Sequence, residues 1–208
     1  MAEQLSKHCW ATAKCGISLA EIYFKGVDRP NNYTFIVVRN PYSRLTSFYM
    51  NKVVYQGNPP WDYKDSYDNE IIIPHLGSGN TGFSFEELVH ELKKVNIRGA
   101  ERHLKPQCVG VLGREFDKWV QLENFKEDIR EVCEELDFDY DVITERKSNH
   151  FPRIDIDYYI GDRPTKWLRE NGLPKDWRMF YNEETLEIVR QIYKEDFRWL
   201  SQFYEETL

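Results

Sequence analysis

The stretch from Tyr33 to Tyr49, YTFIVVRNPYSRLTSFY, places the strongest local constraint on how this chain can fold. Its first part, Tyr33 to Val38, is β-branched and aromatic, which predicts a short buried strand. Asn40-Pro41 ends the strand because proline offers no N–H to a sheet, and proline also suits the first turn of a helix. Apolar side chains then recur at helical spacing at Leu45, Phe48, Tyr49 and Val53. The sequence therefore predicts a strand, a tight turn and a helix.

Charged and hydroxyl side chains gather at this turn. Arg39 lies where the strand ends, and Ser43, Arg44 and Ser47 lie on the turn and the first helical turns. Ligands bind α/β sheets at the carboxyl ends of strands, and arginines, hydroxyls and a helix N-terminus together favour an anion. The simpler interpretation is that Arg39 and Arg44 are solvated charges in an ordinary strand–turn–helix unit. These residues alone leave both interpretations open.

The same residues carry a resemblance to a family. R-N-P-Y-S-R-L-T-S-F-Y, from Arg39 to Tyr49, resembles the 3′-phosphate-binding motif of sulfotransferases, R-[DN]-P-x-x-R-L-x-S-x-Y. It is most similar to carbohydrate sulfotransferases that use 3′-phosphoadenosine-5′-phosphosulfate (PAPS). The resemblance implies that Arg39 and Ser47 hold the 3′-phosphate and that Arg44 supports the loop. It also implies an α/β fold, the three-layer P-loop NTPase-like sulfotransferase fold with a central, mainly parallel sheet, as a single domain over residues 1–208.

A K-x-G-x-S loop that begins at Lys14 is a second candidate anion site. It follows a predicted strand at residues 8–13 and opens a helix predicted from about Ile17. Glycine lets successive N–H groups point inward around a phosphate or sulfate, and the lysine and the helix N-terminus add positive charge. The loop lacks the Gly-Lys-Ser/Thr order of a Walker A loop. Because it precedes the motif above, it resembles the family's 5′-phosphosulfate loop, which implies binding by Lys14, Cys15, Gly16, Ile17 and Ser18.

Three later segments resemble further parts of the family's sequence. The loop RGAERHLKPQC is similar to an H-x-x-P-Q element, with His103, Pro106 and Gln107 in those places. R-K-S-N-H, residues 146–150, resembles an N-K-[ST]-x-H segment near the nucleotide, matched by Lys147 and Ser148, with arginine in place of the usual asparagine. The Y-x-x-D-F pattern of the family's closing helix is present as Tyr193, Asp196 and Phe197.

Helix and strand signals organise the rest of the chain. Ser84 and Glu87 form a capping box before an apolar stripe, which predicts a helix. Asn124 and Glu127 are expected to cap another helix, after a strand at residues 119–122. Asn182 is expected to cap a final helix that runs to about residue 204, and most of 137–181 is expected to be loop.

Composition limits the partners and the compartment. The 208 residues carry 28 basic and 35 acidic side chains, a net charge of −7, which argues against nucleic acid and against a very anionic polymer as acceptor. The four cysteines form no CxxC pair, and Cys108 and Cys133 are expected to be free buried thiols rather than a disulfide. No signal peptide and no run of about 18 apolar residues is present, so no membrane partner is expected. The chain resembles a soluble cytoplasmic enzyme of bacterial or viral type, and a trimmed Golgi-type enzyme would look the same.

The resemblance implies in-line displacement at sulfur, with Lys14 stabilising the developing charge and no metal expected. His103 is the first choice for the general base because histidine ordinarily titrates near neutrality. The alternative is a structural histidine that hydrogen-bonds its loop. His75, His150 and Glu21 are further candidates, and His90, in a helix among glutamates, is expected to be exposed.

The predicted function is that of a PAPS-dependent sulfotransferase that acts on a hydroxyl of a glycan or small glycosylated molecule. One alternative is a P-loop kinase for a nucleotide or small molecule, which the missing Gly-Lys-Ser/Thr order disfavours. The other is a non-catalytic nucleotide- or glycan-binding module. Only residues 21–32 separate the predicted first helix from the next strand. Many family members have a further strand there that often carries the base, so the non-catalytic alternative stays open.

Overall fold

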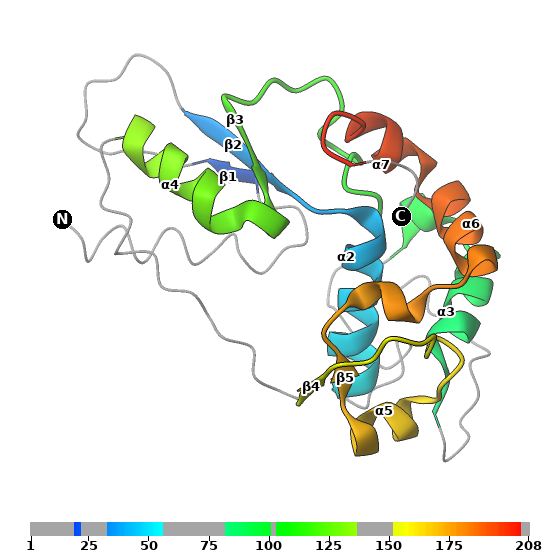
Figure 1. Cartoon of the computed structure of the whole chain (residues 1–208). Coiled ribbons are helices and arrows are strands. Elements are labelled where there is room, and N and C mark those ends of the chain that lie inside the picture. The colour runs from blue at the N-terminus through cyan, green and yellow to red at the C-terminus, as the bar shows by residue number, and fades with distance from the viewer. Residues whose placement is uncertain (1–18, 22–32, 56–81, 101–102, 137–151, 205–208) are drawn as a thin grey trace. The chain divides into compact units, whose positions relative to one another are not determined.

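The computed structural model describes residues 19–21, 33–55, 82–100, 103–136 and 152–204 (Figure 1). The chain divides into two compact units, each built from two stretches of sequence. The first unit is Met1–Arg39 with Gly110–Lys147, and the second is Asn40–Val109 with Ser148–Leu208. Arg39 is therefore the last residue of one stretch and Asn40 the first of another. The single domain over residues 1–208 stays a prediction.

The first unit contains a three-stranded sheet in the order β1-β2-β3. β1 (Leu19–Glu21) pairs antiparallel with β2 (Thr34–Val38), which pairs parallel with β3 (Lys118–Gln121). Asp117 fixes the start of β2, because its carboxylate accepts hydrogen bonds from the Thr34 N–H at 2.7 Å and from the Thr34 hydroxyl at 3.1 Å. The predicted strand at residues 33–38 is confirmed as Thr34–Val38, and the one predicted at 119–122 lies one residue earlier, at Lys118–Gln121.

The helix predicted from about Ile17 is wrong over Leu19–Glu21, where the structure has β1. Leucine, alanine and glutamate all favour helices intrinsically. Here their backbone groups complete one edge of β2, and this pairing outweighs local propensity. Glu21, a candidate base, therefore lies on a strand. The described sheets have three and two strands. They fit an α/β class, but a large, mainly parallel central sheet is not seen among the described residues.

Helix α4 (Phe125–Glu135) packs against this sheet, as Figure 1 shows. The buried residues that join them are Phe35, Val120, Ile129, Val132 and Leu136. The expected side-chain cap by Asn124 is wrong, since its side chain makes no capping hydrogen bond. Asp128 in the first turn instead accepts a hydrogen bond from the Gln121 N–H at 2.6 Å, which ties the helix to the end of β3.

In the second unit, α2 (Pro41–Phe48) continues into a π-helical segment, η1 (Tyr49–Tyr55). Such segments are rare and need their backbone groups satisfied. Arg169 supplies this support, since its guanidinium donates to the Val54 carbonyl at 2.7 Å and to the Val53 carbonyl at 3.2 Å. Arg169 belongs to α5 (Thr165–Asn171), a helix in the region predicted as loop. The strands β4 (Arg153–Ile154) and β5 (Leu173–Pro174) form a short parallel pair in the same region.

Helix α3 (Phe85–Leu92) begins at the predicted capping box, in which Ser84 and Glu87 bond each other's backbone N–H. Among the described residues there are also 3₁₀ turns, η2 (Ile97–Gly99), η3 (Leu122–Asn124) and η5 (Trp177–Phe180). The predicted final helix is instead two helices, α6 (Glu183–Ile192) and α7 (Lys194–Trp199), which meet at Tyr193. Asn182 caps α6 as predicted. The Tyr193 hydroxyl donates to the Leu104 carbonyl at 2.8 Å. The residue at which the two helices meet therefore also ties them to the loop at Leu104.

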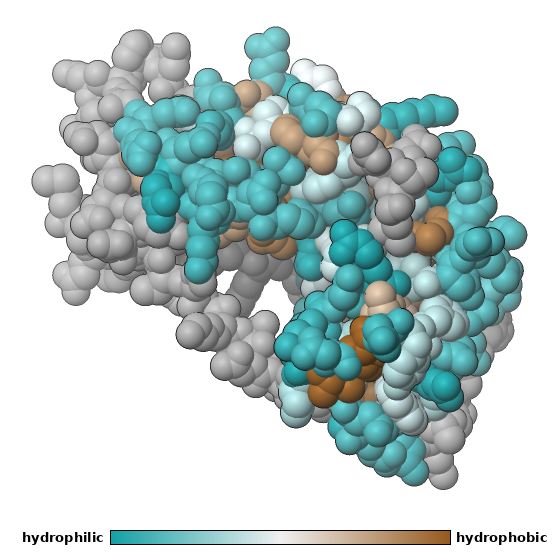
Figure 2. All heavy atoms as spheres, viewed as in Figure 1, coloured by the Kyte–Doolittle hydropathy of each residue, from teal (hydrophilic) through white to brown (hydrophobic). Residues whose placement is uncertain are grey.

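The core of the second unit is rich in aromatic side chains. Phe85 and Tyr181 pack edge to face with ring centroids 5.0 Å apart, and Tyr42 lies 4.9 Å from Phe197. Such pairs add to the burial of large rings. Hydrophilic side chains cover most of the described surface in the view of Figure 2. Among the described residues, no helix combines the length and the apolar character that crossing a bilayer requires.

Candidate functional site

The predicted strand–turn–helix at Arg39 is present, with β2 ending at Val38 and α2 beginning at Pro41. Asn40 caps the helix, because its side-chain oxygen accepts from the N–H groups of Tyr42 at 2.9 Å and Ser43 at 3.4 Å. The Arg44 N–H donates to the Asn40 carbonyl at 2.9 Å. The first N–H groups of α2 are thus already bonded. An anion at this turn would depend on side chains more than on the helix N-terminus.

Arg39 is half-buried and lies beside an acidic side chain of its own unit. Its Nε is 4.0 Å from Oε1 of Glu123, and the two side chains are 28% and 36% exposed. An ion pair this long and this exposed contributes little to stability. The contact with Glu123 therefore does little to hold the Arg39 guanidinium in place.

Ser47 is half-buried on α2 and is held by Asn51, one turn later in the chain. The Asn51 amide donates to the Ser47 carbonyl at 2.9 Å and to its Oγ at 3.2 Å. Oγ is the acceptor in the second bond, so that bond does not use the hydroxyl proton. Ser43 is fully buried, and its hydroxyl donates to the Asn40 carbonyl at 3.2 Å. Of the two serines, Ser47 is therefore the one suited to bind a ligand.

Asp196 is a fully buried carboxylate that joins α7 to the H-x-x-P-Q loop. Its Oδ2 accepts from the Gln107 N–H at 2.8 Å and its Oδ1 accepts from the Cys108 N–H at 2.9 Å. Burial raises the pKa of Asp196, while the two backbone N–H groups and the positive charge of Arg44 act in the opposite direction. Arg44 is itself only 8% exposed. Residues from three family-like segments thus meet at one buried carboxylate.

The two described cysteines, Cys108 and Cys133, are free and buried, as predicted. Burial, with a further contribution from Asp196, raises the pKa of Cys108 to about 12. A thiol with such a pKa stays protonated and is a poor nucleophile. Cys108 is therefore a packing residue.

His103 is half-buried beside the end of α2, where its ring lies 6.5 Å from the ring of Phe48, centroid to centroid. The loop that follows it is fixed at two points: Tyr193 bonds the Leu104 carbonyl, and Asp196 bonds the next N–H groups. His103 therefore lies on a segment anchored to α7, and it is close to Phe48, the residue that follows Ser47. Its role as general base stays a prediction.

Several predicted site residues lie outside the described residues. They are the loop residues Lys14, Cys15, Gly16, Ile17 and Ser18, the pair Lys147 and Ser148, and the further candidates His75 and His150. Their roles stay predictions.

A cavity of about 440 Å³ opens between the end of α3 and the α6–α7 segment. Apolar side chains from α3 and α6, including Leu92, Ile188 and Ile192, line it together with charged ones such as Arg98 and Glu195. Neither Ser47 nor His103 is among its lining residues. The cavity is therefore not the place where these two candidates would meet a ligand.

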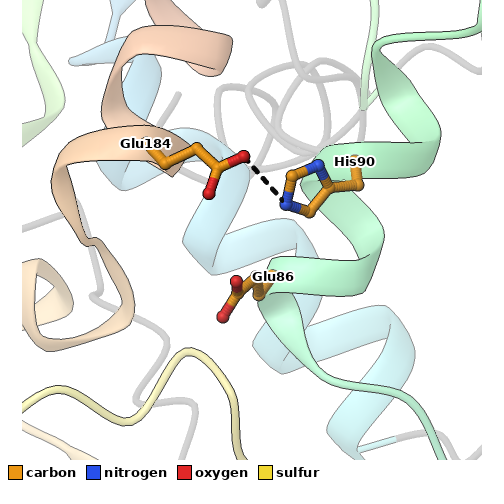
Figure 3. Close-up of side chains that lie close together, drawn as sticks. All are labelled: Glu86, His90 and Glu184. Atoms are coloured by element: carbon orange, nitrogen blue, oxygen red, sulfur yellow. Dashed lines mark ion pairs between the residues drawn. The ribbon is translucent and has the colours of Figure 1, made fainter.

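Sequence reasoning missed two polar groupings. In the sequence Asp196 is apparent only as part of the closing-helix pattern, and its place next to Phe197, in the predicted apolar stripe, is the one signal of a buried acceptor. His90 was expected to be exposed, but it is half-buried and its Nε2 lies 3.7 Å from Oε1 of Glu184. Glu86, four residues before His90 on α3, belongs to the same grouping (Figure 3). The i, i+4 spacing of Glu86 and His90 is the sequence signal that these two side chains lie on the same face of α3.

Comparison with known proteins decides the family. A family model described as the sulfotransferase family matches residues 20–203, which is most of the chain. The protein belongs to the sulfotransferase family. No curated protein and no solved structure matches the chain significantly. The matched range includes the Arg39 motif, the His103 loop and the helices α6 and α7, but it begins after the Lys14 loop.

Membership makes this sulfotransferase-family protein a transferase, and it implies sulfuryl transfer to an acceptor that bears a hydroxyl. Membership also gives a structural role to the loop at residues 104–108 and to the buried Arg44 and Asp196. They hold together segments of the sulfotransferase that lie far apart in the sequence.

Proposed function

We propose that the protein transfers a sulfuryl group from PAPS to a hydroxyl of a carbohydrate or small glycosylated molecule. The observation that carries the proposal is the family match over residues 20–203, which spans the whole Arg39–Ser47 motif. The position of this motif, between the end of β2 and the first turns of α2, supports the proposal because ligands bind α/β sheets at such ends.

Arg39 and Ser47 would bind the 3′-phosphate of the nucleotide. Both side chains are half-buried, so they are partly fixed and still open to a ligand. A guanidinium matches the geometry of a phosphate, and the Ser47 hydroxyl can donate its proton. The contact of Arg39 with Glu123 is long, at 4.0 Å, so the loss of this one contact costs little.

The phosphosulfate would be bound by the Lys14 loop, from Lys14 to Ser18, with Lys147 and Ser148 near the nucleotide. These roles rest on the sequence resemblance alone. A lysine beside inward-pointing N–H groups can stabilise charge on the bridging and sulfuryl oxygens. The proposed transfer uses no metal, because the lysine supplies the positive charge.

His103 would act as the general base. The acceptor oxygen forms a bond to sulfur while the bond from sulfur to the bridging phosphate oxygen breaks. The hydroxyl proton passes to His103, and adenosine 3′,5′-bisphosphate leaves. The anchoring of the following loop by Tyr193 and Asp196 supports this role, since a base must be held in position.

The first experiment measures thermal stabilisation by adenosine 3′,5′-bisphosphate, with ATP and AMP for comparison. A ligand at a hundred times its Kd stabilises by about 2.7 kcal/mol, so binding raises the Tm visibly. Arg39→Ala removes charge-assisted hydrogen bonds worth about 1.5–3 kcal/mol, which is roughly a 10- to 150-fold loss of affinity. Arg114→Ala, at an exposed arginine of the same unit, is the matched control and keeps full affinity. An equal response to ATP and to the bisphosphate would contradict the proposal.

A second experiment separates binding from chemistry. His103→Ala is expected to keep bisphosphate affinity and to lower the rate of acceptor-dependent bisphosphate release by about 10²- to 10⁴-fold. Full turnover in this variant would assign the base to another residue. Loss of bisphosphate binding would show that His103 supports the nucleotide site instead.

A further inference from the structure

Two helices of the second unit bring three potential metal ligands together. Glu86 and His90 lie one turn apart on α3, and Glu184 lies in the first turn of α6. One ligand atom from each residue lies within 4.8 Å of the other two. Figure 3 shows Glu184 facing His90 across the gap between the helices, with Glu86 one turn along α3. The cluster joins residues nearly a hundred positions apart in the sequence.

The backbone that carries these residues is held firmly. Capping boxes fix the first turns of both helices, through Ser84 on α3 and Asn182 on α6. The Glu86 N–H also donates to the Gly161 carbonyl at 2.9 Å. Both helices bury their apolar sides in the same core, as Leu88 and Ile188 illustrate. The backbone positions of the three residues are therefore set before any ion binds.

Glu86 is oriented by a further pair of residues. The Tyr159 hydroxyl donates to Oε2 of Glu86 at 2.6 Å, and the Asn182 amide donates to the Tyr159 oxygen at 3.1 Å. A carboxylate held at one oxygen can bind a cation with the other. Hydrogen bonds of this kind from outside the ligand set are typical of metal sites and orient the ligands.

The chemistry of the ligands selects the class of ion. One imidazole and two carboxylates suit a divalent transition metal, whereas Ca²⁺ and Mg²⁺ prefer oxygen ligands alone. Ligand atoms bound to zinc at about 2.0–2.1 Å lie roughly 3.3 Å apart in tetrahedral geometry. His90 and Glu184 are already 3.7 Å apart. The Glu184 side chain is 65% exposed and can turn to close the rest of the gap.

We propose that Glu86, His90 and Glu184 form a binding site for a divalent transition-metal ion of the zinc type. Water would complete the coordination, since the cluster is partly exposed. The ion would balance two carboxylates that otherwise repel each other. It would also link α3 to α6 and so stabilise the second unit. The site is independent of the sulfuryl transfer proposed above, because none of its residues is assigned to nucleotide or acceptor.

The competing explanation is an ion pair between protonated His90 and Glu184. The positive end of α6 favours Glu184 as an anion under either explanation, and it opposes an imidazolium and a metal ion alike, so it does not separate the two. The two explanations differ in one measurable respect. Only a metal site gives a saturable response to added Zn²⁺ that depends on both His90 and Glu184.

The test is calorimetric titration of the chelator-treated full chain with Zn²⁺, together with Tm measured with and without the ion. We expect one saturable equivalent and a rise in Tm, with Mg²⁺ giving neither. His90→Ala and Glu184→Gln are expected to weaken this equivalent at least tenfold. Glu187→Gln, one turn further along α6 and also exposed, is the matched control and keeps it. Tyr159→Phe keeps all three ligands and is expected to weaken binding by about 10-fold or more.

Two results would overturn the proposal: the absence of a saturable zinc equivalent in the unaltered chain, and an equivalent of unchanged affinity in both His90→Ala and Glu184→Gln. Circular dichroism of each variant without metal checks that it folds. His90 and Glu184 are 39% and 65% exposed, so their replacement leaves the core intact.

Discussion

A fully buried carboxylate such as that of Asp196 is tolerated only when its oxygens are bonded. Each of its oxygens accepts one backbone N–H, from Gln107 and from Cys108. Asp196→Asn replaces one oxygen by an amide donor, so one of these N–H groups then faces a donor. We expect the free energy of unfolding to fall by about 1–3 kcal/mol, measured by urea denaturation.

The control for this prediction is the neighbouring acidic residue. Glu195→Gln makes the same change of charge, but Glu195 is 38% exposed and pairs with Arg98 at the surface. Its replacement is expected to cost at most about 1 kcal/mol. Equal losses in the two variants would mean that the buried hydrogen bonds of Asp196 do not stabilise the fold.

The Cys108 thiol gives a prediction for pH. Its pKa is raised to about 12, first by burial and then by Asp196. The thiolate fraction at pH 8 is therefore about one in ten thousand, compared with roughly a quarter for a thiol with the ordinary pKa of about 8.5. We expect iodoacetamide at pH 8 to leave Cys108 unlabelled in the native protein and to label it in urea, as read by peptide mass spectrometry. Rapid labelling of native Cys108 at pH 8 would show that the residue is accessible and ionised.

At the scale of single elements, the capping box of α3 is a local device with a measurable effect. The Ser84 hydroxyl accepts from the Glu87 N–H at 3.1 Å, and the Glu87 carboxylate accepts from the Ser84 N–H at 2.7 Å. Ser84→Ala breaks the first bond, and we expect a loss of about 1 kcal/mol in the free energy of unfolding. Ser201→Ala, at an exposed serine after α7, should change it by less than about 0.5 kcal/mol.

The elements that the sequence predicted are those encoded by neighbouring residues. The turn at Asn40 and the capping boxes at Ser84 and Asn182 depend on side chains within three positions of their targets, so they can be found in sequence. β1 could not be found in this way. Its residues favour a helix, and only pairing with β2, more than ten residues later, makes them a strand.

In the candidate site, too, features encoded by neighbouring residues could be predicted, and features that depend on distant residues could not. Arg39, Ser47 and His103 were identifiable from their motifs, and the motif is placed at a strand end and helix start as predicted. The partners of Asp196 could not be identified from the sequence, because they join α7 to a distant loop. The cluster around His90 could not be identified either, because it joins α3 to α6. Such contacts depend on how helices pack, and packing follows from the whole core rather than from local spacing.

At the scale of the whole molecule, both compact units use both halves of the chain. β2 in the first unit pairs with β3, which lies beyond residue 110, and α3 in the second packs against α6. A fragment that ends at Val109 would therefore leave β2 without its parallel partner and expose the apolar face of α3. We expect fragment 1–109 to show no cooperative thermal transition by circular dichroism, whereas the full chain unfolds cooperatively. The physical reason is that non-local contacts must offset the entropy lost on ordering each element, and the fragment lacks them. A sharp melting transition in the fragment would mean that residues 1–109 contain a self-sufficient core, and the division into two interleaved units would then be wrong.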